Sequence, residues 1–320
     1  MTGALPPPDL EDRFHAPAGW QWGRFTNPAG TSLRYGWAAP EGARAVAVVV
    51  GGFREFAEKY FEMMRDLMAR DFAVWFLDWR GQGGSERYYP QPHRPGAAGY
   101  DRDVADLHQF ITGIIRAEAR LPRVLFCHSM GGHIGLRYLH DHPGTFACAV
   151  MTAPMFEINY QGMPRGLARL IAESGSLFGR GGRYIPTGKD WGWDDSFTVE
   201  QSLLTQDPVR YLVADRWMRH QGELALGDAT VSWLANAMRS IALINRPSYL
   251  HTIRTPVLIA SPQADEVVDA RAHARAAQHL PAATLFAVPG AKHELWMEKD
   301  EYRRPWLAEM DRFLARHIGV

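Results

Sequence analysis

The stretch LFCHSMGGHIG (Leu125–Gly135) predicts a strand that turns sharply into a helix, with Ser129 at the turn. The usual pattern of such a turn is G-x-S-x-G, in which small residues prevent clashes between the turn, the helix and the neighbouring strand. Cys127 occupies the first glycine position here, whereas Gly131 keeps the second. Because cysteine is one of the smaller alternatives to glycine, we expect a slightly crowded turn that is still formed. The alternative is an ordinary strand–loop–helix with a helix-capping serine.

Apolar segments and segments of helical periodicity alternate along much of the chain. Continuous apolar runs are typical of strands buried on both faces of a parallel sheet, and they occur at residues 45–52, 72–81, 123–129, 146–154, 255–266 and 283–293. Helical patterns occur at 58–71, 100–119, 131–143, 270–281 and 302–318. This alternation predicts an α/β fold with a mostly parallel central sheet flanked by helices.

The alternation stops after Pro154 and resumes near residue 248. Residues 155–247 are rich in Gly, Arg and Trp and contain helical patches with weak strand signals. We therefore predict a helical cap insertion at 155–247 between two parts of one core, at 20–154 and 248–320. Residues 1–19 contain four prolines and few apolar residues, and we expect a loosely held tail.

Composition excludes several classes of protein. Lys+Arg and Asp+Glu are both 35, giving a net charge of zero, and the absence of a long basic run argues against nucleic acid as a partner. Two cysteines cannot form a disulfide framework, which fits a reducing compartment. The N-terminal segment has no pattern of a secretory signal, and the apolar runs are too short to span a bilayer. We expect a soluble cytoplasmic protein without an obligate protein partner.

A nucleophilic serine needs a base, and the base needs a carboxylate that orients it. Asp265 follows one predicted strand and His293 follows the next, so the chain order is Ser, Asp, His, and both side chains fall at the carboxyl edge of the sheet. Glu266 and Asp269 are rivals for the carboxylate, but Asp265 comes first after its strand. His128 is adjacent to Ser129 in sequence, and we expect the turn to direct it away, into the core.

A tetrahedral intermediate would need two backbone N–H donors. The N–H of Met130, directly after the serine, is one candidate, and Phe53 in the loop GGFREFAEKY (51–60) is the other. An ordinary glycine turn is the alternative for this loop. The Gly-rich segment DWRGQGGSE (78–86) lacks the Lys-Ser/Thr pair of a phosphate-binding loop, and HDH (140–142) has no partner at metal-ligand spacing. We expect no cofactor and no metal.

The segments FCHSMGG, GGFREFAEKY, LDWRGQGGSE and GAKHELWMEKDE together resemble the lysophospholipase and monoacylglycerol lipase branch of the α/β-hydrolases, also described as the serine aminopeptidase-like family. The resemblance covers roughly residues 20–318. It implies Ser129, Asp265 and His293 as the catalytic triad, Phe53 and Met130 as oxyanion-hole donors, and a cap over the site. Cys127 and Gly51 depart from the family pattern, in which many members have His-Gly at 51–52.

The expected function is hydrolysis of a carboxylic ester through an acyl-enzyme, with a lysophospholipid or monoacylglycerol as the substrate that the resemblance implies. A small-ester esterase, a peptidase and a non-catalytic ligand-binding protein of the same fold remain alternatives. Trp191 and Trp193 in the insertion are candidates for an acyl pocket or for peripheral membrane contact, although aromatic residues in a helical insertion are more often local core.

Overall fold

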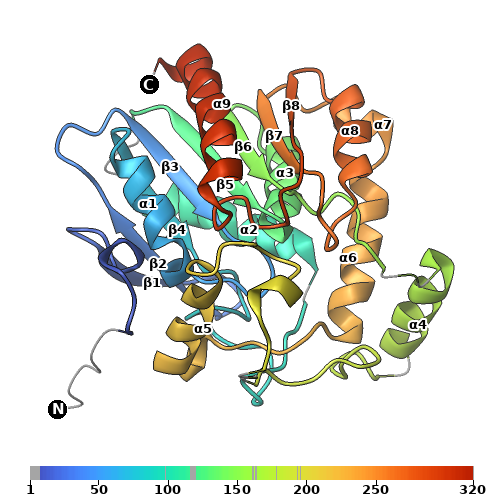
Figure 1. Cartoon of the computed structure of the whole chain (residues 1–320). Helices are drawn as coiled ribbons and strands as arrows, with labels where there is room; N and C mark the ends of the chain where they lie inside the picture. The colour runs from blue at the N-terminus through green and yellow to red at the C-terminus, as the bar shows by residue number, and fades with distance from the viewer. Residues whose placement is uncertain are drawn as a thin grey trace.

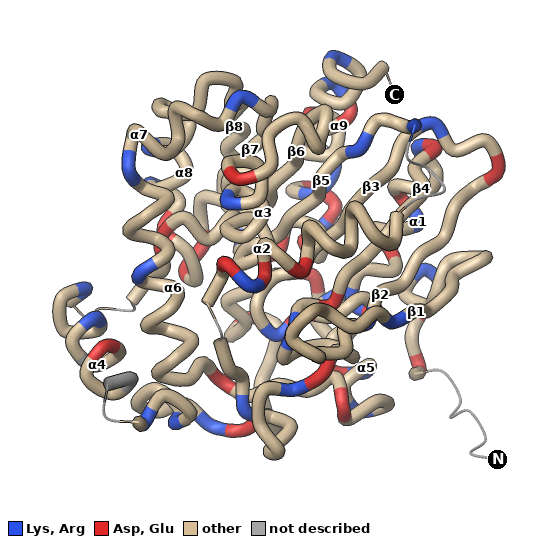
Figure 2. The backbone as a smooth tube through the Cα atoms, turned by 180° about the vertical axis from the view of Figure 1, so that it is seen from behind, with Lys and Arg blue, Asp and Glu red and all other residues tan. Residues whose placement is uncertain are grey.

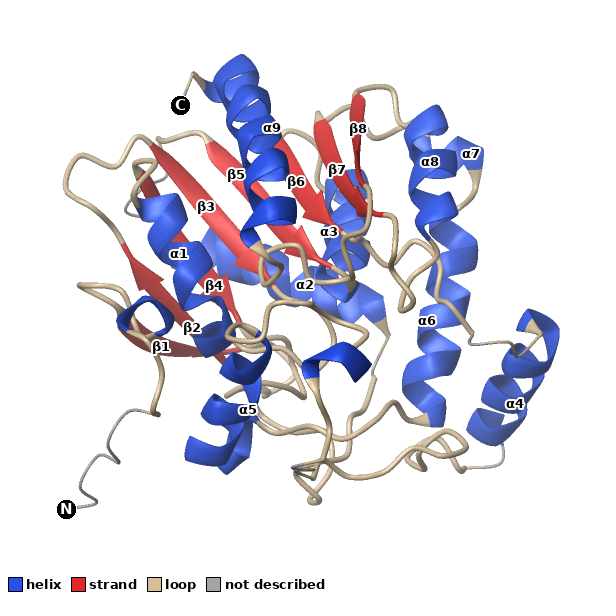
Figure 3. Cartoon of the chain, in the orientation of Figure 1, coloured by secondary structure: helices blue, strands red, loops and turns tan. Residues whose placement is uncertain are grey.

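The computed structural model describes residues 8–97, 99–115, 120–160, 162, 164–177, 179–192, 194 and 196–319. Its centre is one eight-stranded sheet with the order β1-β2-β4-β3-β5-β6-β7-β8 (Figure 3). The strands are β1 (Gln21–Thr26), β2 (Ser32–Ala38), β3 (Ala45–Val50), β4 (Phe72–Leu77), β5 (Arg123–His128), β6 (Cys148–Thr152), β7 (Val257–Pro262) and β8 (Ala283–Val288). From β4 to β8 all neighbouring strands are parallel, which confirms the predicted mostly parallel sheet.

Two antiparallel strands at one edge were not predicted. β1 pairs with β2, and β2 pairs with β4, both in antiparallel register. β1 is largely exposed and carries no continuous apolar run, so it gives none of the signal of the buried strands. The central strands β3 and β4 are fully buried, as their sequences indicate.

Helices cover both faces of the sheet, and each face has its own hydrophobic core (Figure 1). On one face lie α1 (Phe61–Met68) and α9 (Asp300–Ile318); on the other lie α2 (Tyr100–Gln109), α3 (Met130–Asp141) and α8 (Ala270–His279). The pattern at 100–119 predicted one longer helix, but α2 ends at Gln109 and a single π-helical segment follows at Phe110–Ile114. Residues 116–119 lie outside the described part of the chain.

Between β6 and β7 the chain forms α4 (Arg165–Leu177), α5 (Tyr211–His220) and α6 (Val231–Ile244), followed by the short α7 (Pro247–Leu250). Short 3-10 helices lie at Asp12–Phe14, Ala57–Tyr60, Val199–Gln201 and Gly222–Leu224. α4 packs on α6 through a small cluster of alanines and Met238. Among the described residues of this segment, β-pairing is limited to isolated bridges, in agreement with its weak strand signals.

The described part of the N-terminal segment is packed, not loosely held. Phe14 is 1% exposed and belongs to the core beneath α1. Its carbonyl oxygen accepts a hydrogen bond from the indole N–H of Trp217 in α5, at 3.2 Å. Within the expected tail at 1–19, Phe14 thus anchors the described part to the core, whereas residues 1–7 lie outside the described part of the chain.

Basic and acidic positions are interspersed along the backbone (Figure 2). No helix among the described residues is long and apolar enough to cross a membrane. The interspersed charges agree with the equal numbers of basic and acidic residues in the sequence.

Candidate active site

Ser129 stands at a strained turn between β5 and α3. Its φ of 50° and ψ of −117° lie outside the regions that a residue with a side chain ordinarily adopts. The turn is held by the Ser129 N–H, which donates to the Thr152 carbonyl oxygen at 3.1 Å, and the glycine at 131 is required because a Cβ there would lie 2.5 Å from the Gly51 carbonyl oxygen. Strain of this kind persists where the surrounding structure enforces it and is typical of functional sites.

Cys127, which replaces the first glycine of the usual pattern, fits because Gly135 has no side chain. The Cys127 side chain is 2% exposed, and a Cβ placed on Gly135 would lie 2.6 Å from the Cys127 Sγ. The glycine six residues after the serine therefore leaves the space that the cysteine fills. Burial raises the pKa of the Cys127 thiol well above its ordinary value, so the thiol stays protonated.

Asp265 and His293 are brought together from the ends of β7 and β8. His293 Nδ1 lies 2.7 Å from Asp265 Oδ2, and Asp265 Oδ1 accepts the N–H groups of Val267 and Val268 at 2.7 and 3.0 Å. Burial would raise the pKa of Asp265, but His293 and these N–H groups outweigh it and the pKa is lowered. Burial would lower the pKa of His293, but the Asp265 carboxylate outweighs it and the pKa is raised.

The rival carboxylates lie in other environments. Glu266 is exposed, and Asp269 caps the N-terminus of α8 by accepting the Arg271 N–H at 3.0 Å. Asp265 is the member of this group that bonds His293.

His128 is buried as expected, but it does not point away from the candidate site. Its Nδ1 lies 3.1 Å from both oxygens of Thr152, and its ring centroid lies 4.7 Å from that of His293. Side chains of a strand alternate between the two faces of a sheet, so Cys127 enters one core while His128 faces the other side, next to His293. Burial lowers the pKa of His128 to about 3, and the ring is neutral at physiological pH.

The loop after β3 lies beside the serine turn. A Cβ on Gly52 would lie 3.0 Å from the Ser129 Cβ. The Gly51 carbonyl accepts from the Trp79 indole at 2.9 Å, and the Gly52 carbonyl accepts from the Gln82 amide at 2.6 Å. In the described part of the chain, the backbone N–H groups of Phe53 and Met130 donate to no protein acceptor. Both groups are thus available for an oxygen of a ligand.

A buried ion network beneath this loop was not found from the sequence. Glu55 accepts the Gly52 N–H and the Tyr60 hydroxyl, the latter at 2.5 Å. Lys59 Nζ donates to Glu55 at 2.8 Å and to Glu294 at 2.5 Å. The lysine therefore connects the loop of Phe53 to the residue that follows His293. The i,i+4 spacing of Glu55 and Lys59 was the available signal, but that spacing is ordinary on a solvated helix face.

Glu55, His128 and Glu294 place potential ligand atoms within 4.8 Å of one another. Lys59 already donates to both carboxylates of this group. A divalent cation there would have to displace the buried ammonium, so the arrangement fits an ion network better than a metal centre.

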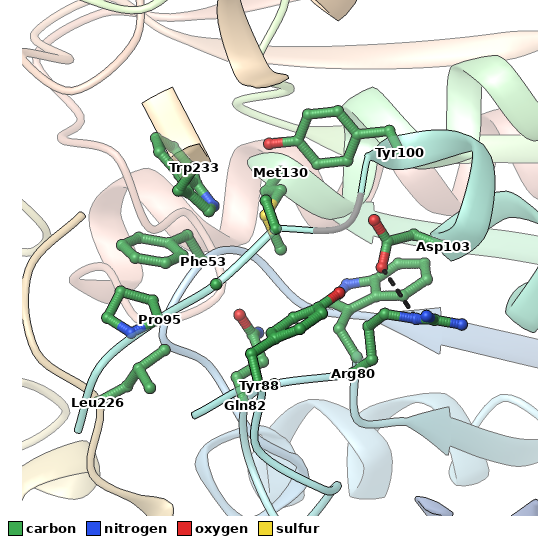
Figure 4. Close-up of a pocket in the computed structure, with 14 residues that line it drawn as sticks. Phe53, Arg80, Gln82, Tyr88, Pro95, Tyr100, Asp103, Met130, Leu226 and Trp233 are labelled. Carbon is green, nitrogen blue, oxygen red and sulfur yellow. Dashed lines mark ion pairs between the residues drawn. The ribbon is translucent and has the colours of Figure 1, made fainter. Parts of the chain in front are cut away.

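A cavity of about 20 Å³ borders Phe53 and Met130. Figure 4 shows Phe53 and Trp233 on one side of it and Arg80 and Asp103 on the other. Trp233 belongs to α6, and Leu226 precedes that helix, so the 155–247 segment forms part of the wall beside the candidate site.

Of the two tryptophans considered for an acyl pocket or for membrane contact, the structure describes Trp191. Trp191 is partly buried against the core beneath α1 and α9, and Trp193 lies outside the described residues. The exposed large apolar residues of the insertion include Leu167 and Leu170 on α4, which are 48% and 64% exposed.

Comparison with known proteins identifies the family. The family model described as "Serine aminopeptidase, S33" matches residues 41–300. Lysophospholipase L2 of Escherichia coli (strain K12) is 31% identical over 282 residues, covering 85% of this chain and 81% of that protein. A monoacylglycerol lipase of Mycolicibacterium smegmatis is 22% identical and covers 87% of this chain and 91% of its own length.

The fold has solved counterparts. A soluble variant of monoglyceride lipase from Saccharomyces cerevisiae in complex with a substrate analog superposes with a TM-score of 0.70 at 21% identity, covering 93% of this chain and 96% of that chain. A carboxyl esterase from Bacillus coagulans superposes with a TM-score of 0.70 at 17% identity, covering 95% of this chain and 100% of that chain. These matches confirm the predicted α/β-hydrolase fold and the resemblance inferred from the motifs. The chain belongs to the serine aminopeptidase S33 family, as a carboxylic ester hydrolase of the lysophospholipase and monoacylglycerol lipase type.

Proposed function

We propose that the chain hydrolyses lysophospholipids or monoacylglycerols through an acyl-enzyme on Ser129. The observation that carries the proposal is the Asp265–His293 pair, joined at 2.7 Å, whose histidine ring lies beside the residue preceding the strained Ser129 turn. The names of the relatives support the substrate class, because the family includes a lysophospholipase at 31% identity.

In the proposed reaction the Ser129 hydroxyl attacks the ester carbonyl carbon while His293 Nε2 takes its proton. Asp265 accepts the Nδ1–H of His293, which fixes the tautomer and stabilises the imidazolium. The N–H groups of Phe53 and Met130 bind the oxyanion of the tetrahedral intermediate. His293 then protonates the leaving alcohol, and a water molecule activated by the same ring releases the fatty acid and restores Ser129.

A fluorophosphonate probe tests the nucleophile directly. We expect the wild-type protein to be labelled and Ser129→Ala and His293→Ala to remain unlabelled, with Ser196→Ala and His251→Ala as controls on exposed residues of the same types. A series of lysophospholipids, monoacylglycerols, short-chain esters and aminoacyl amides then identifies the substrate. Faster turnover of short esters or amides would favour the esterase or peptidase alternative. A folded wild-type protein that takes no label would refute the mechanism and favour a ligand-binding role.

A further inference from the structure

The cavity beside Phe53 and Met130 has aromatic walls and an acidic group. Five aromatic side chains line it, those of Phe53, Trp79, Tyr88, Tyr100 and Trp233. Aromatic faces carry partial negative charge and attract cations, most strongly when water is excluded. The walls alone would accept any small apolar group, so the polar groups in the cavity decide its ligand.

The acidic group is Asp103, on the first turn of α2. It is 8% exposed, and its Oδ1 lies 4.0 Å from Nε of Arg80. Arg80 makes its short contacts, at 2.5 Å, with Asp106 instead. The Arg80 guanidinium thus faces two buried carboxylates, and its interaction with Asp103 is the weaker of the two. Burial and the neighbouring Asp106, opposed by Arg80, raise the pKa of Asp103 to about 7. Arg137 also lowers this pKa and Asp101 raises it. A cation bound in the cavity itself would stabilise the Asp103 carboxylate further.

Two residues that line the cavity carry a further polar group without a partner. The Tyr100 hydroxyl and the Trp233 indole N–H lack a hydrogen-bond partner among the described residues, although the side chains are only 4% and 9% exposed. Buried polar groups without partners are uncommon in folded proteins and point to a missing ligand or water. The hydroxyl can accept a hydrogen bond from an N–H donor, and the indole can donate to an oxygen of the same ligand.

We propose that this cavity binds the primary ammonium group of the substrate's alcohol part, that is, an ethanolamine-type head group, with Asp103 as its counter-ion and Tyr100 as an acceptor. The inference rests on the proposed ester hydrolysis at Ser129, because the cavity borders the two candidate oxyanion donors.

Size and charge favour this ligand over the alternatives. A volume of about 20 Å³ accommodates one water-sized group, which suits an ammonium better than a bulkier trimethylammonium or an acyl chain. A phosphate inside the cavity is disfavoured, because Arg80 in the cavity wall is already paired and Asp103 would repel an anion. The phosphate of an ethanolamine lipid would therefore lie outside the cavity, with its ammonium inside.

The test compares lysophosphatidylethanolamine with lysophosphatidylglycerol of the same acyl chain. The wild-type protein should hydrolyse the ethanolamine lipid with the higher kcat/KM. Asp103→Asn should lower the ratio of the two kcat/KM values by about tenfold or more, mainly through KM, because a desolvated charge pair is lost. Asp141→Asn removes an exposed carboxylate at the end of α3 that does not act on Asp103 and should leave the ratio unchanged. An Asp103→Asn ratio equal to that of the wild type overturns the proposal.

Two further measurements separate this site from the hydrolase chemistry and from misfolding. Tyr100→Phe keeps the ring and removes a hydroxyl that has no protein partner, so it should fold normally and lower the same ratio several-fold. If neither lipid is hydrolysed while Ser129 is labelled, the substrate proposal fails, and the cavity is tested by the Tm shift that ethanolamine produces. If ethanolamine raises the Tm of the wild type but not that of Asp103→Asn, the ammonium site is supported. If ethanolamine changes the Tm of both proteins equally, or of neither, the proposal is overturned.

Discussion

The buried lysine of the Glu55–Lys59–Glu294 network gives a prediction whose magnitude follows from the structure. Lys59→Met keeps the length of the side chain but removes the ammonium that contacts both carboxylates at 2.8 and 2.5 Å. All three side chains are at most 8% exposed, so water cannot replace the lost partner. The protein must therefore hold a proton on a glutamate, and burial already raises the pKa of Glu294 in the wild type.

The cost of that proton can be calculated. Holding one glutamate neutral at pH 7, against an ordinary pKa of about 4.3, costs about 1.36 × 2.7 ≈ 3.7 kcal/mol. The value agrees with the loss of about 3–5 kcal/mol when a buried ion pair loses one partner. At pH 5 the same calculation gives about 1 kcal/mol. A carboxyl group whose folded-state pKa is raised contributes stability that is lost as the pH rises, so the variant should be more destabilised at pH 7 than at pH 5.

Urea unfolding followed by tryptophan fluorescence, at pH 5 and pH 7, measures both free energies. Lys299→Met is the matched control, because Lys299 is exposed and its replacement should change the free energy of unfolding by less than about 0.5 kcal/mol. A loss below about 1 kcal/mol at pH 7, or an equal loss at both pH values, would refute the reasoning that the two carboxylates depend on this lysine.

Three other predictions concern the site and the core. The kcat/KM of ester hydrolysis should rise with pH through an apparent pKa above 6.5, because His293 must be neutral to accept a proton and Asp265 raises its pKa; a midpoint below 6.5 in the pH–rate profile would contradict this. Gly135→Ala should lower the free energy of unfolding by about 1–3 kcal/mol, since its Cβ would meet the Cys127 sulfur, and Cys127→Gly in the same chain should restore most of the loss. Phe14→Ala should cost about 3–5 kcal/mol by urea unfolding, whereas a loosely held tail would give almost no change.

The sequence predicted the elements that carry a strong local signal. The buried parallel strands have continuous apolar runs, and the Ser129 turn has a pattern of small residues. Short stretches of sequence were therefore enough to locate both along the chain. β1 could not, because an exposed edge strand such as Gln21–Thr26 needs little apolar content. Phe14 gave no local signal either, because its burial depends on contacts such as that with Trp217, about 200 residues away along the chain.

The same limit applies at the site. The chain order of Ser129, Asp265 and His293 could be predicted because each follows a recognisable strand. The partner of Lys59 could not, since Glu294 is 235 positions away and a buried ion pair has the same composition as an exposed one. The role of Gly135 also required the structure, because the space that its missing side chain leaves for the Cys127 sulfur lies between a strand and the next helix.

The two cysteines of the chain have a practical consequence for spectroscopy. Cys127 and Cys148 are both buried, and burial raises the pKa of Cys148 to about 12, so neither thiol should react with maleimides in the folded protein. A cysteine introduced at Leu170, on the exposed side of α4, would then be the one solvent-facing thiol of the enzyme. A polarity-sensitive fluorophore attached there would report, without any background labelling, whether this helix approaches a lipid vesicle during turnover.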